Sequence, residues 1–299
     1  MWLPLLLAAA TLVIPLGLDL YMPVPDGNPV TTDKLALGRS LFNDRRLSVD
    51  GSIACASCHR PGRAFSDGRA TARGVKGRTG VRNVPALINR GYGRAFSWDG
   101  RHQSLEAQVL APIEVPNEMG SSVAAAAERV GLTPQVMGGA LASYVRSILS
   151  GGSRFDRFTT GDREALSAVE RQGLQVFRGK GNCTACHVGP NFSDERTHNT
   201  GVAWRAGLPT DAGAGGGAFK TPTLRESART APYMHDGSLA TLRDVVDFYD
   251  GGGHRNPGLD EEIRPLRLTV ADKEALVALL QALSGELRDG PTSVKPEPR

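Results

Sequence analysis

The sequence predicts an all-α protein made of two similar halves, with long irregular loops between the helices. Gly (36) and Pro (19) are plentiful, and no long run alternates apolar with polar residues as a large sheet would require. The motif C-x-x-C-H occurs twice, at 55–59 and at 183–187. Similar helix-forming segments precede and follow each copy. The 299 residues are enough for two domains of ordinary size.

The first 23 residues predict a leader. No charge lies between Trp2 and Leu18, but Pro4 and Pro15 interrupt this apolar stretch. It is longer than most signal-peptide cores and shorter than the ~20 residues that span a bilayer. We therefore expect an export signal or an N-terminal membrane anchor, rather than a buried first helix, and a periplasmic protein.

The first half is expected to cover residues 24–157. Thr32 can cap a helix over 33–42, and Thr133, followed by proline, can cap a second helix that ends at Gly151. The apolar face of the earlier helix consists of Leu35, Gly38, Leu41 and Phe42. A Pro- and Gly-containing linker at 24–32 opens this half.

The second half is expected to cover 158–288, followed by a polar tail at 289–299. A helix is predicted over 162–177, and Thr269 can cap a closing helix that stops at Gly285. The lead-in helices of both halves end in the pattern G-x-x-x-F, at 38–42 and 173–177. Each half therefore consists of a helix, a C-x-x-C-H motif, loops and a terminal helix.

The two motifs predict covalent haem. Two thiols at this spacing can add to the vinyl groups of haem, and the next histidine then binds the iron. The thiols are Cys55 and Cys58 with His59, and Cys183 and Cys186 with His187. A four-cysteine zinc site, redox-active dithiols and disulfides are alternatives, but none of them requires the histidine. We predict two haem c groups, in two cytochrome c-like domains packed together.

The sixth iron ligand decides what each haem can do. An iron with two protein ligands only passes electrons, whereas an open iron can bind a small molecule. The remaining histidines are His102, His198, His235 and His254, and neither histidine nor methionine occurs between Arg60 and Ser97. This favours an open first haem. The net charge of +4, without a dense basic run, argues against nucleic-acid binding.

Several ordered motifs carry a family resemblance. They include WDGR at 98–101, PNEMG at 116–120, HNTG at 198–201, KTPTLRES at 220–227 and TAPYMHDG at 230–237. With these motifs the chain resembles the bacterial di-haem cytochrome c peroxidases and MauG, over nearly its whole length after the leader. The resemblance implies activation of hydrogen peroxide at the first haem. Electrons would come through the second haem from a small cytochrome c or copper protein, or from a partner protein.

The resemblance also implies roles for residues of the first half. Trp98 resembles a tryptophan that relays electrons between the haems, although most buried tryptophans only pack. Gln108 resembles a distal-pocket glutamine, and Pro112 resembles the residue over the reactive haem that cannot ligate it. Glu118 resembles the distal carboxylate that moves a proton between the peroxide oxygens. In isolation, such a glutamate would be read as a surface residue.

Further roles follow from the same resemblance. Asn83, Thr230 and Pro232 resemble a calcium site between the domains, made of amide and carbonyl oxygens. His235 resembles a histidine near the haems, which we read as a pocket residue and not as an iron ligand. Met234 has the chemistry of a sixth ligand, but a core position is expected for it.

Two departures from the peroxidases separate the haems. Typical peroxidases carry a methionine ligand of the second haem where this chain has Tyr249, as MauG does; the alternative is a core tyrosine at the end of a helix over 239–250. A methionine raises the potential, whereas a phenolate favours oxidised iron. Many peroxidases also have a capping histidine before the RNVP motif, and this chain has none. We therefore expect the first haem to be open in the resting ferric state.

Two other functions remain as alternatives. One is MauG-like, peroxide-dependent oxidation of residues on a partner protein. The other is a non-catalytic di-haem electron carrier, which requires two haems with six ligands each.

Overall fold

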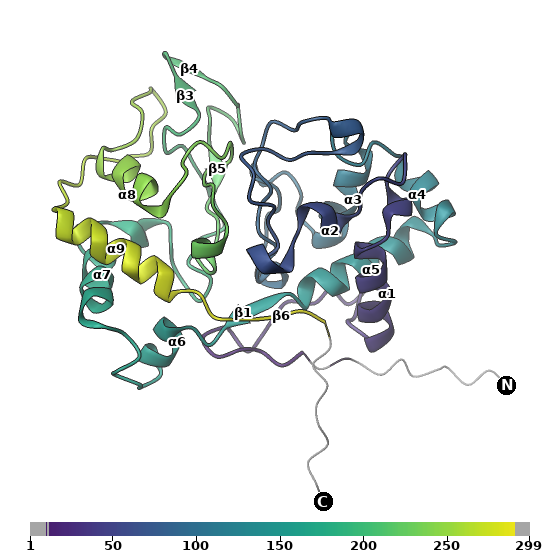
Figure 1. Ribbon diagram of the computed structural model, residues 1–299, viewed down its shortest axis with the longest axis horizontal. Helices are drawn as coiled ribbons and strands as arrows, with labels where there is room; N and C mark the ends of the chain where they lie inside the picture. Colours follow the sequence, from purple (N-terminus) through teal and green to yellow (C-terminus); the bar gives the residue numbers. More distant parts are fainter. Residues whose placement is uncertain (1–9, 11, 291–299) are drawn as a thin grey trace, which may run out of the picture.

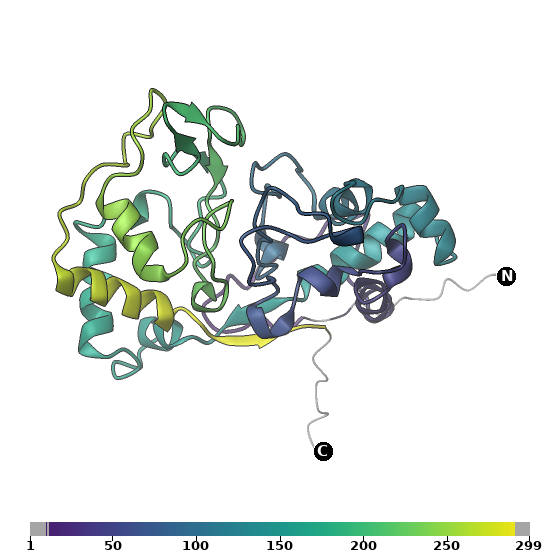
Figure 2. The ribbon, with the colours of Figure 1, turned by 45° about the horizontal axis from the view of Figure 1, so that its top comes forward.

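A computed structural model describes residue 10 and residues 12–290. Two halves lie side by side, and strands β1 and β6 run along the bottom between them (Figures 1 and 2). The helices are α1 (Thr32–Phe42), α2 (Cys55–Cys58), α3 (Leu105–Glu114), α4 (Val123–Arg129), α5 (Pro134–Arg146), α6 (Arg154–Thr159), α7 (Ala168–Arg178), α8 (Leu242–Asp250) and α9 (Val270–Ala282). Short 3₁₀ turns η1 (Arg45–Leu47), η2 (Pro61–Arg63), η3 (Val75–Gly77), η4 (Arg90–Tyr92), η5 (Cys183–Ala185) and η6 (Ser227–Arg229) lie in the loops.

The repeat seen in the sequence has a structural cause. Helix α1 crosses α5 in the first half, and α7 crosses α9 in the second. A Cβ at Gly38 would overlap the carbonyl oxygen of Ala140, and a Cβ at Gly173 would overlap that of Ala275. The glycine of each G-x-x-x-F pattern therefore allows two helix backbones to touch.

The apolar core follows the same division. One cluster draws its buried members from the first half, including Leu41, Phe42, Leu141 and Tyr144. A second cluster draws on the second half, including Phe177, Leu276 and Leu280.

The expectation of an all-α chain is incomplete, because the described residues also form three two-stranded antiparallel sheets. Strand β1 (Leu149–Gly151) pairs with β6 (Glu286–Arg288), β2 (Thr197–His198) with β5 (Phe219–Lys220), and β3 (Trp204–Arg205) with β4 (Leu208–Pro209). Strands of two or three residues are too short to show alternation in a sequence.

The pairing of β1 with β6 brings residues 286–290 to the first half. Asp289 accepts hydrogen bonds from Arg39, at 2.8 Å, and from the hydroxyl of Tyr144, at 2.8 Å. Asp289, the first residue of the expected polar tail, thus packs on helices α1 and α5.

Several helix boundaries differ from the expected ones. The caps at Thr133 and Thr269 are confirmed, but the first helix is capped by Thr31 instead of Thr32. Helix α7 begins only at Ala168, because Ser167 forms a capping box with the glutamate three residues later. Helix α5 ends at Arg146, because the chain turns into β1 before Gly151. The helix expected over 239–250 begins at Leu242.

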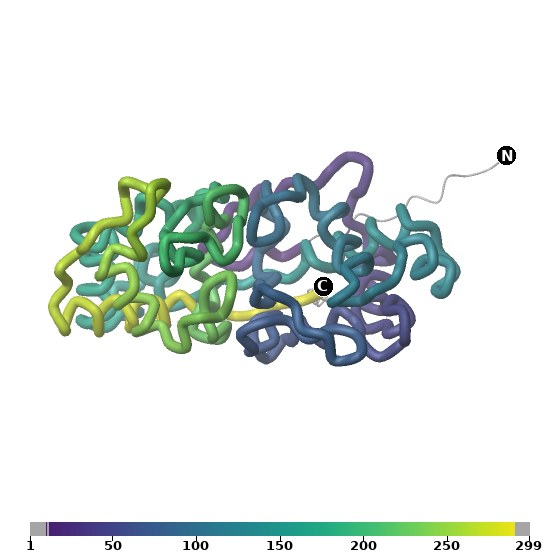
Figure 3. Tube along the Cα trace, turned by 90° about the horizontal axis from the view of Figure 1, so that it is seen from above, coloured from purple at the N-terminus to yellow at the C-terminus, as the bar shows by residue number. Residues whose placement is uncertain are grey.

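The leader expected at 1–23 overlaps the folded body. Leu18 and Met22 are buried against Leu149, and Arg225 donates a hydrogen bond of 2.9 Å to the carbonyl oxygen of Gly17. Figure 3 shows this segment running across both halves. Residues 12–22 are therefore part of the fold, whereas residues 1–9 and 11 of the expected leader lie outside the described residues. Within the described part, no helix has the length and apolar character needed to cross a bilayer.

Candidate functional site

The first C-x-x-C-H motif lies on the single turn of α2. Cys55 and Cys58, three residues apart, share one face of this turn. Nδ1 of His59 lies 2.8 Å from the carbonyl oxygen of Phe65, so that ring nitrogen is engaged and Nε2 is the one left to bind a metal.

The second motif repeats this arrangement on η5. Nδ1 of His187 lies 2.7 Å from the carbonyl oxygen of Phe192. Phe65 and Phe192 both have left-handed backbones, with φ of 59° and 51°, a conformation that costs of order 1 kcal/mol in a bulky residue. Burial lowers the pKa of His59 and of His187, which favours the neutral imidazole that binds iron.

The cysteines do not fit the alternatives to haem. All four are free, so neither motif is a disulfide. Burial raises the pKa of Cys55 and Cys183 to about 12, and of Cys58 and Cys186 to about 11, which disfavours the thiolate of a redox dithiol. No cluster of metal-ligand atoms in the described residues joins the two pairs.

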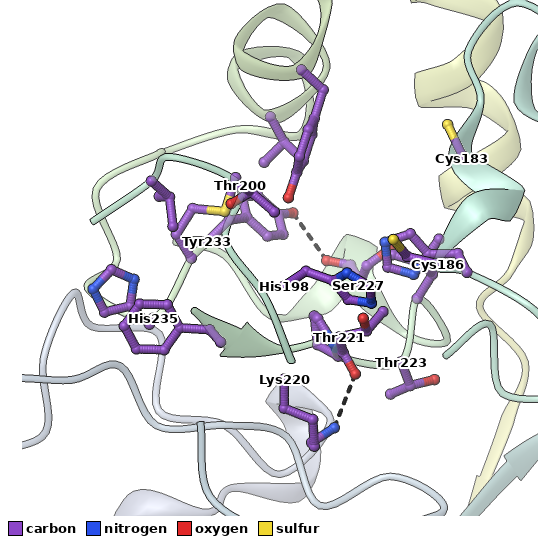
Figure 4. A pocket seen from close by; sticks show the side chains of 18 of the residues that line it. Cys183, Cys186, His198, Thr200, Lys220, Thr221, Thr223, Ser227, Tyr233 and His235 are labelled. Atoms are coloured by element: carbon purple, nitrogen blue, oxygen red, sulfur yellow. Dashed lines mark hydrogen bonds between the residues drawn. The ribbon is translucent and has the colours of Figure 1, made fainter. Parts of the chain in front are cut away.

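A cavity of about 330 Å³ opens beside the second motif and extends to the boundary between the halves (Figure 4). Its wall includes Cys183, Cys186 and His187, together with Tyr249 from the last turn of α8. Apolar side chains supply much of the rest, among them Leu242, Val246, Leu276 and Leu280. The free cysteines, the oriented imidazole and the apolar wall fit a haem.

Tyr249 is the candidate sixth ligand on this cavity. Burial raises the pKa of its phenol to about 12, although a hydrogen bond with Thr200 works in the opposite direction. Without a cation the phenol therefore keeps its proton. A ferric iron held at His187 would supply the missing positive charge, and Tyr249 would then be its candidate second protein ligand. Ligation by Tyr249 remains a prediction.

Met234 and His235 also line this cavity. Met234 is partly buried and packs against the cluster of Val202, Ala203 and Phe219 while also lining the cavity, so the core position expected for it is only partly confirmed. The ring of His235 stacks on Phe219 with the centroids 3.8 Å apart, and the residue is only 2% exposed.

Trp98 lies where the two halves meet. Its indole N–H donates a 2.8 Å hydrogen bond to the carbonyl oxygen of Asn83 in the first half. Its own carbonyl oxygen accepts a 2.7 Å hydrogen bond from the backbone N–H of Lys220 in the second half. The indole also packs against Val202 and Phe219. Trp98 is thus held from both sides.

The expected distal residues come from α3 and the turn that follows it. Gln108 and Pro112 lie four residues apart on α3, and Oε1 of Gln108 accepts a 2.7 Å hydrogen bond from the Ser97 hydroxyl. Burial raises the pKa of Glu118, with Arg101 opposing the shift. The carboxylate lies near the first motif, since its charge contributes to the raised pKa of Cys58 after burial and Asp67.

The structure brings together only part of the expected calcium site. The Asn83 amide nitrogen lies 2.7 Å from the carbonyl oxygen of Arg69 and 3.4 Å from that of Pro232. If the amide is turned over, its oxygen joins two carbonyl oxygens, the ligand type that Ca²⁺ prefers. The Thr230 hydroxyl donates instead to Ser227, at 3.2 Å. Calcium remains a prediction, and sequence reasoning missed Arg69.

Two ion-pair clusters across the boundary were also missed. Arg82 of the first half bonds Asp211 of the second, at 2.7 and 2.8 Å. Arg90 bonds Glu195 at 2.9 and 3.1 Å, and Glu195 lies 3.4 Å from Lys220. The two residues of each ion pair across the boundary are more than 100 residues apart in sequence. The spacing of residues along the chain therefore could not predict these pairs.

Comparison with known proteins gives consistent matches. The family model described as "Di-haem cytochrome c peroxidase" matches residues 32–164. The methylamine utilization protein MauG of Methylorubrum extorquens is 38% identical, over 89% of this chain and 82% of its own. The cytochrome-c peroxidase IdrP1 of Denitromonas iodatirespirans is 35% identical, over 90% and 86%. The crystal structure of a MauG-like protein associated with microbial copper homeostasis superposes with a TM-score of 0.82 at 32% identity, covering 90% of this chain and 94% of that one.

Proposed function

Because this chain belongs to the di-haem cytochrome c peroxidase and MauG family, an oxidoreductase family that acts on peroxide, we propose that it works in the periplasm with two different haems. The haem at His59 reacts with hydrogen peroxide, and the haem at His187 exchanges electrons with a protein partner. The observation that carries the proposal is the cavity at the second motif, where His187 shares the wall with a candidate second ligand, Tyr249.

The expected distal residues have side chains that suit peroxide chemistry. Bound at His59, haem supplies an iron that binds peroxide and takes up its oxidising equivalents. Glu118 takes a proton from one peroxide oxygen and returns it to the other, because burial keeps its pKa above the usual range. Oε1 of Gln108 is occupied by Ser97, which leaves the amide N–H groups to donate to peroxide. Pro112 offers no ligand atom.

Trp98 suits a relay between the halves. Electrons hop more readily through an indole held in one orientation, and bonds from both halves hold this one. A calcium ion at Asn83 would stiffen the same region, because Asn83 accepts the indole N–H through its carbonyl oxygen.

Tyr249 favours the MauG-like form of this function. A buried phenol with a pKa near 12 becomes a phenolate only beside a cation, and a phenolate stabilises oxidised iron. The second haem would then store oxidising equivalents and draw electrons from residues of a partner protein. A small cytochrome c or copper protein is the donor in the peroxidase form.

One experiment separates these functions. One equivalent of hydrogen peroxide is added to the resting ferric protein without a donor, and spectra are followed over minutes. A long-lived state, oxidised by two electrons, supports the MauG-like form. Rapid turnover of reduced cytochrome c only after pre-reduction supports the ordinary peroxidase. Two low-spin, six-coordinate ferric haems that do not react with peroxide would support the non-catalytic electron carrier.

A further inference from the structure

The strongest unassigned feature is a buried cluster on the wall of the haem cavity. It consists of Arg90 from η4, Glu195 from the loop after the second motif and Lys220 from β5. The side chains are 12%, 16% and 9% exposed, respectively. Arg90 and Lys220 both line the cavity. This cluster therefore brings two cations from different halves to the space where a haem fits.

The cluster lacks one negative charge. Both Glu195 oxygens bond Arg90, at 2.9 and 3.1 Å, and Lys220 reaches the same carboxylate only at 3.4 Å. The shorter contact of the Lys220 ammonium is a neutral one, 2.9 Å to the carbonyl oxygen of Thr221 (Figure 4). Two cations thus share one carboxylate, and buried charges are ordinarily paired.

The pKa values of Lys220 and Glu195 agree with this count of charges. Burial, followed by the charge of Arg90, lowers the pKa of Lys220 to about 8. Burial works against ionisation of Glu195, but Arg90 outweighs it and lowers the pKa of that carboxyl to about 2. The charges of Glu195 and Asp194 favour the ammonium of Lys220, but they do not offset burial and the charge of Arg90.

Nearby acids are engaged elsewhere. Asp194 and Asp260 both bond the ring of His198, at 2.8 and 2.5 Å, and together they raise its pKa against the effect of burial. The buried hydroxyl of Ser227, by contrast, has no partner among the described residues and lines the same cavity. Lys220, Thr221, Thr223 and Ser227 belong to one segment along the wall in Figure 4. The wall therefore offers hydrogen-bond donors and positive charge that suit a bound anion.

We propose that Lys220, together with Arg90, binds a propionate carboxylate of the haem held at His187. This inference rests on the proposed function only in assuming a haem in the cavity. A carboxylate is the anionic group that haem carries, and an ammonium beside a guanidinium is a suitable receptor for it. With the propionate bound, the cluster contains two cations, Arg90 and Lys220, and two anions, Glu195 and the propionate.

This contact has a structural consequence. The backbone N–H of Lys220 bonds the carbonyl oxygen of Trp98 at 2.7 Å. Lys220, which would hold the propionate, is thereby hydrogen-bonded to Trp98, the expected relay residue. Arg90 connects the same site to the first half. Lys220 is a positioning residue in this role, acting on the haem and through it on electron exchange.

The test measures the reduction potentials of both haems in the holoprotein, without peroxide. Lys220→Met should lower the potential of the His187 haem more than that of the His59 haem, because removing a cation stabilises oxidised iron. Lys220→Arg should restore most of the potential. Glu195→Gln should shift it in the opposite direction. Lys34→Met, which removes a lysine of α1 outside the cavity, should change neither potential.

Resonance Raman bands of propionate bending supply a second measurement, and Lys220→Met should shift them. Unchanged potentials and bands, or equal shifts at both haems, would overturn the proposal. So would a wild-type potential that follows the concentration of chloride or nitrate, because a free solvent anion would then occupy the site. If Lys220→Met fails to incorporate haem, Lys220→Arg and Glu195→Gln still decide the sign. Failure of peroxide chemistry with these shifts intact would count against the proposed function alone.

Discussion

Replacing Glu118 by glutamine removes the proposed proton carrier with little change in size. Glu118 is held by the turn after α3, where its carbonyl oxygen accepts a 2.9 Å hydrogen bond from the backbone N–H of Val75. The backbone anchor survives the substitution, so the effect should be chemical. General acid–base catalysis contributes roughly 10²–10⁴-fold, so we expect the rate constant with peroxide to fall by about 100-fold, or ~2.7 kcal/mol.

Stopped-flow mixing of the ferric protein with peroxide measures this constant. The pH dependence of this rate constant tests the direction of the predicted effect. Only the carboxylate can accept a proton, and burial raises the pKa of Glu118, so the rate should rise with pH through that raised pKa and level off above it. Glu118→Gln should abolish the rise. Glu114→Gln, at an exposed position on α3, is the matched control. A Glu118→Gln rate within threefold of the wild type would refute the proton role.

Tyr249→Met should raise the reduction potential of the second haem in a redox titration, and time-resolved spectra should show a shorter lifetime of the state formed by one equivalent of peroxide. An unchanged potential would show that Tyr249 is not an iron ligand. Trp98→Phe keeps an aromatic ring but loses its N–H bond, and should slow electron exchange between the haems in flash-reduction experiments while leaving the initial peroxide rate unchanged. Gly173→Ala places a methyl group against a backbone carbonyl oxygen of α9 and should lower the free energy of unfolding in urea by about 1–3 kcal/mol, whereas Gly27→Ala meets open space and should be neutral.

Local chemistry explains which expectations succeeded. The caps at Thr133 and Thr269 were predictable, because a cap needs only a hydroxyl and the next turn of chain. The repeated glycines of the G-x-x-x-F patterns were visible as a pattern, but their purpose was not. That purpose depends on α5 and α9, whose carbonyl oxygens lie about 100 residues further along the chain.

Expectations that depended on competition between local signals were less accurate. Residues 162–167 have helix-forming character, but the capping box at Ser167 starts α7 later. Likewise, an apolar leader was predicted as far as residue 23, yet Leu18 and Met22 find a buried surface beside Leu149. An apolar segment can enter a membrane or a core, and only the available surface decides between them.

The sequence by itself determined the chemistry that this protein can carry: two sets of thiols and an imidazole at haem-attachment spacing, and the family to which they belong. Tertiary structure decided what surrounds each set. It placed Trp98 between hydrogen bonds from both halves, and it brought Arg90 and Lys220, which line the cavity at the second motif, to the carboxylate of Glu195. The physical reason is that attachment depends on neighbouring residues along the chain. The charge and burial that tune a site depend instead on segments that meet only after folding.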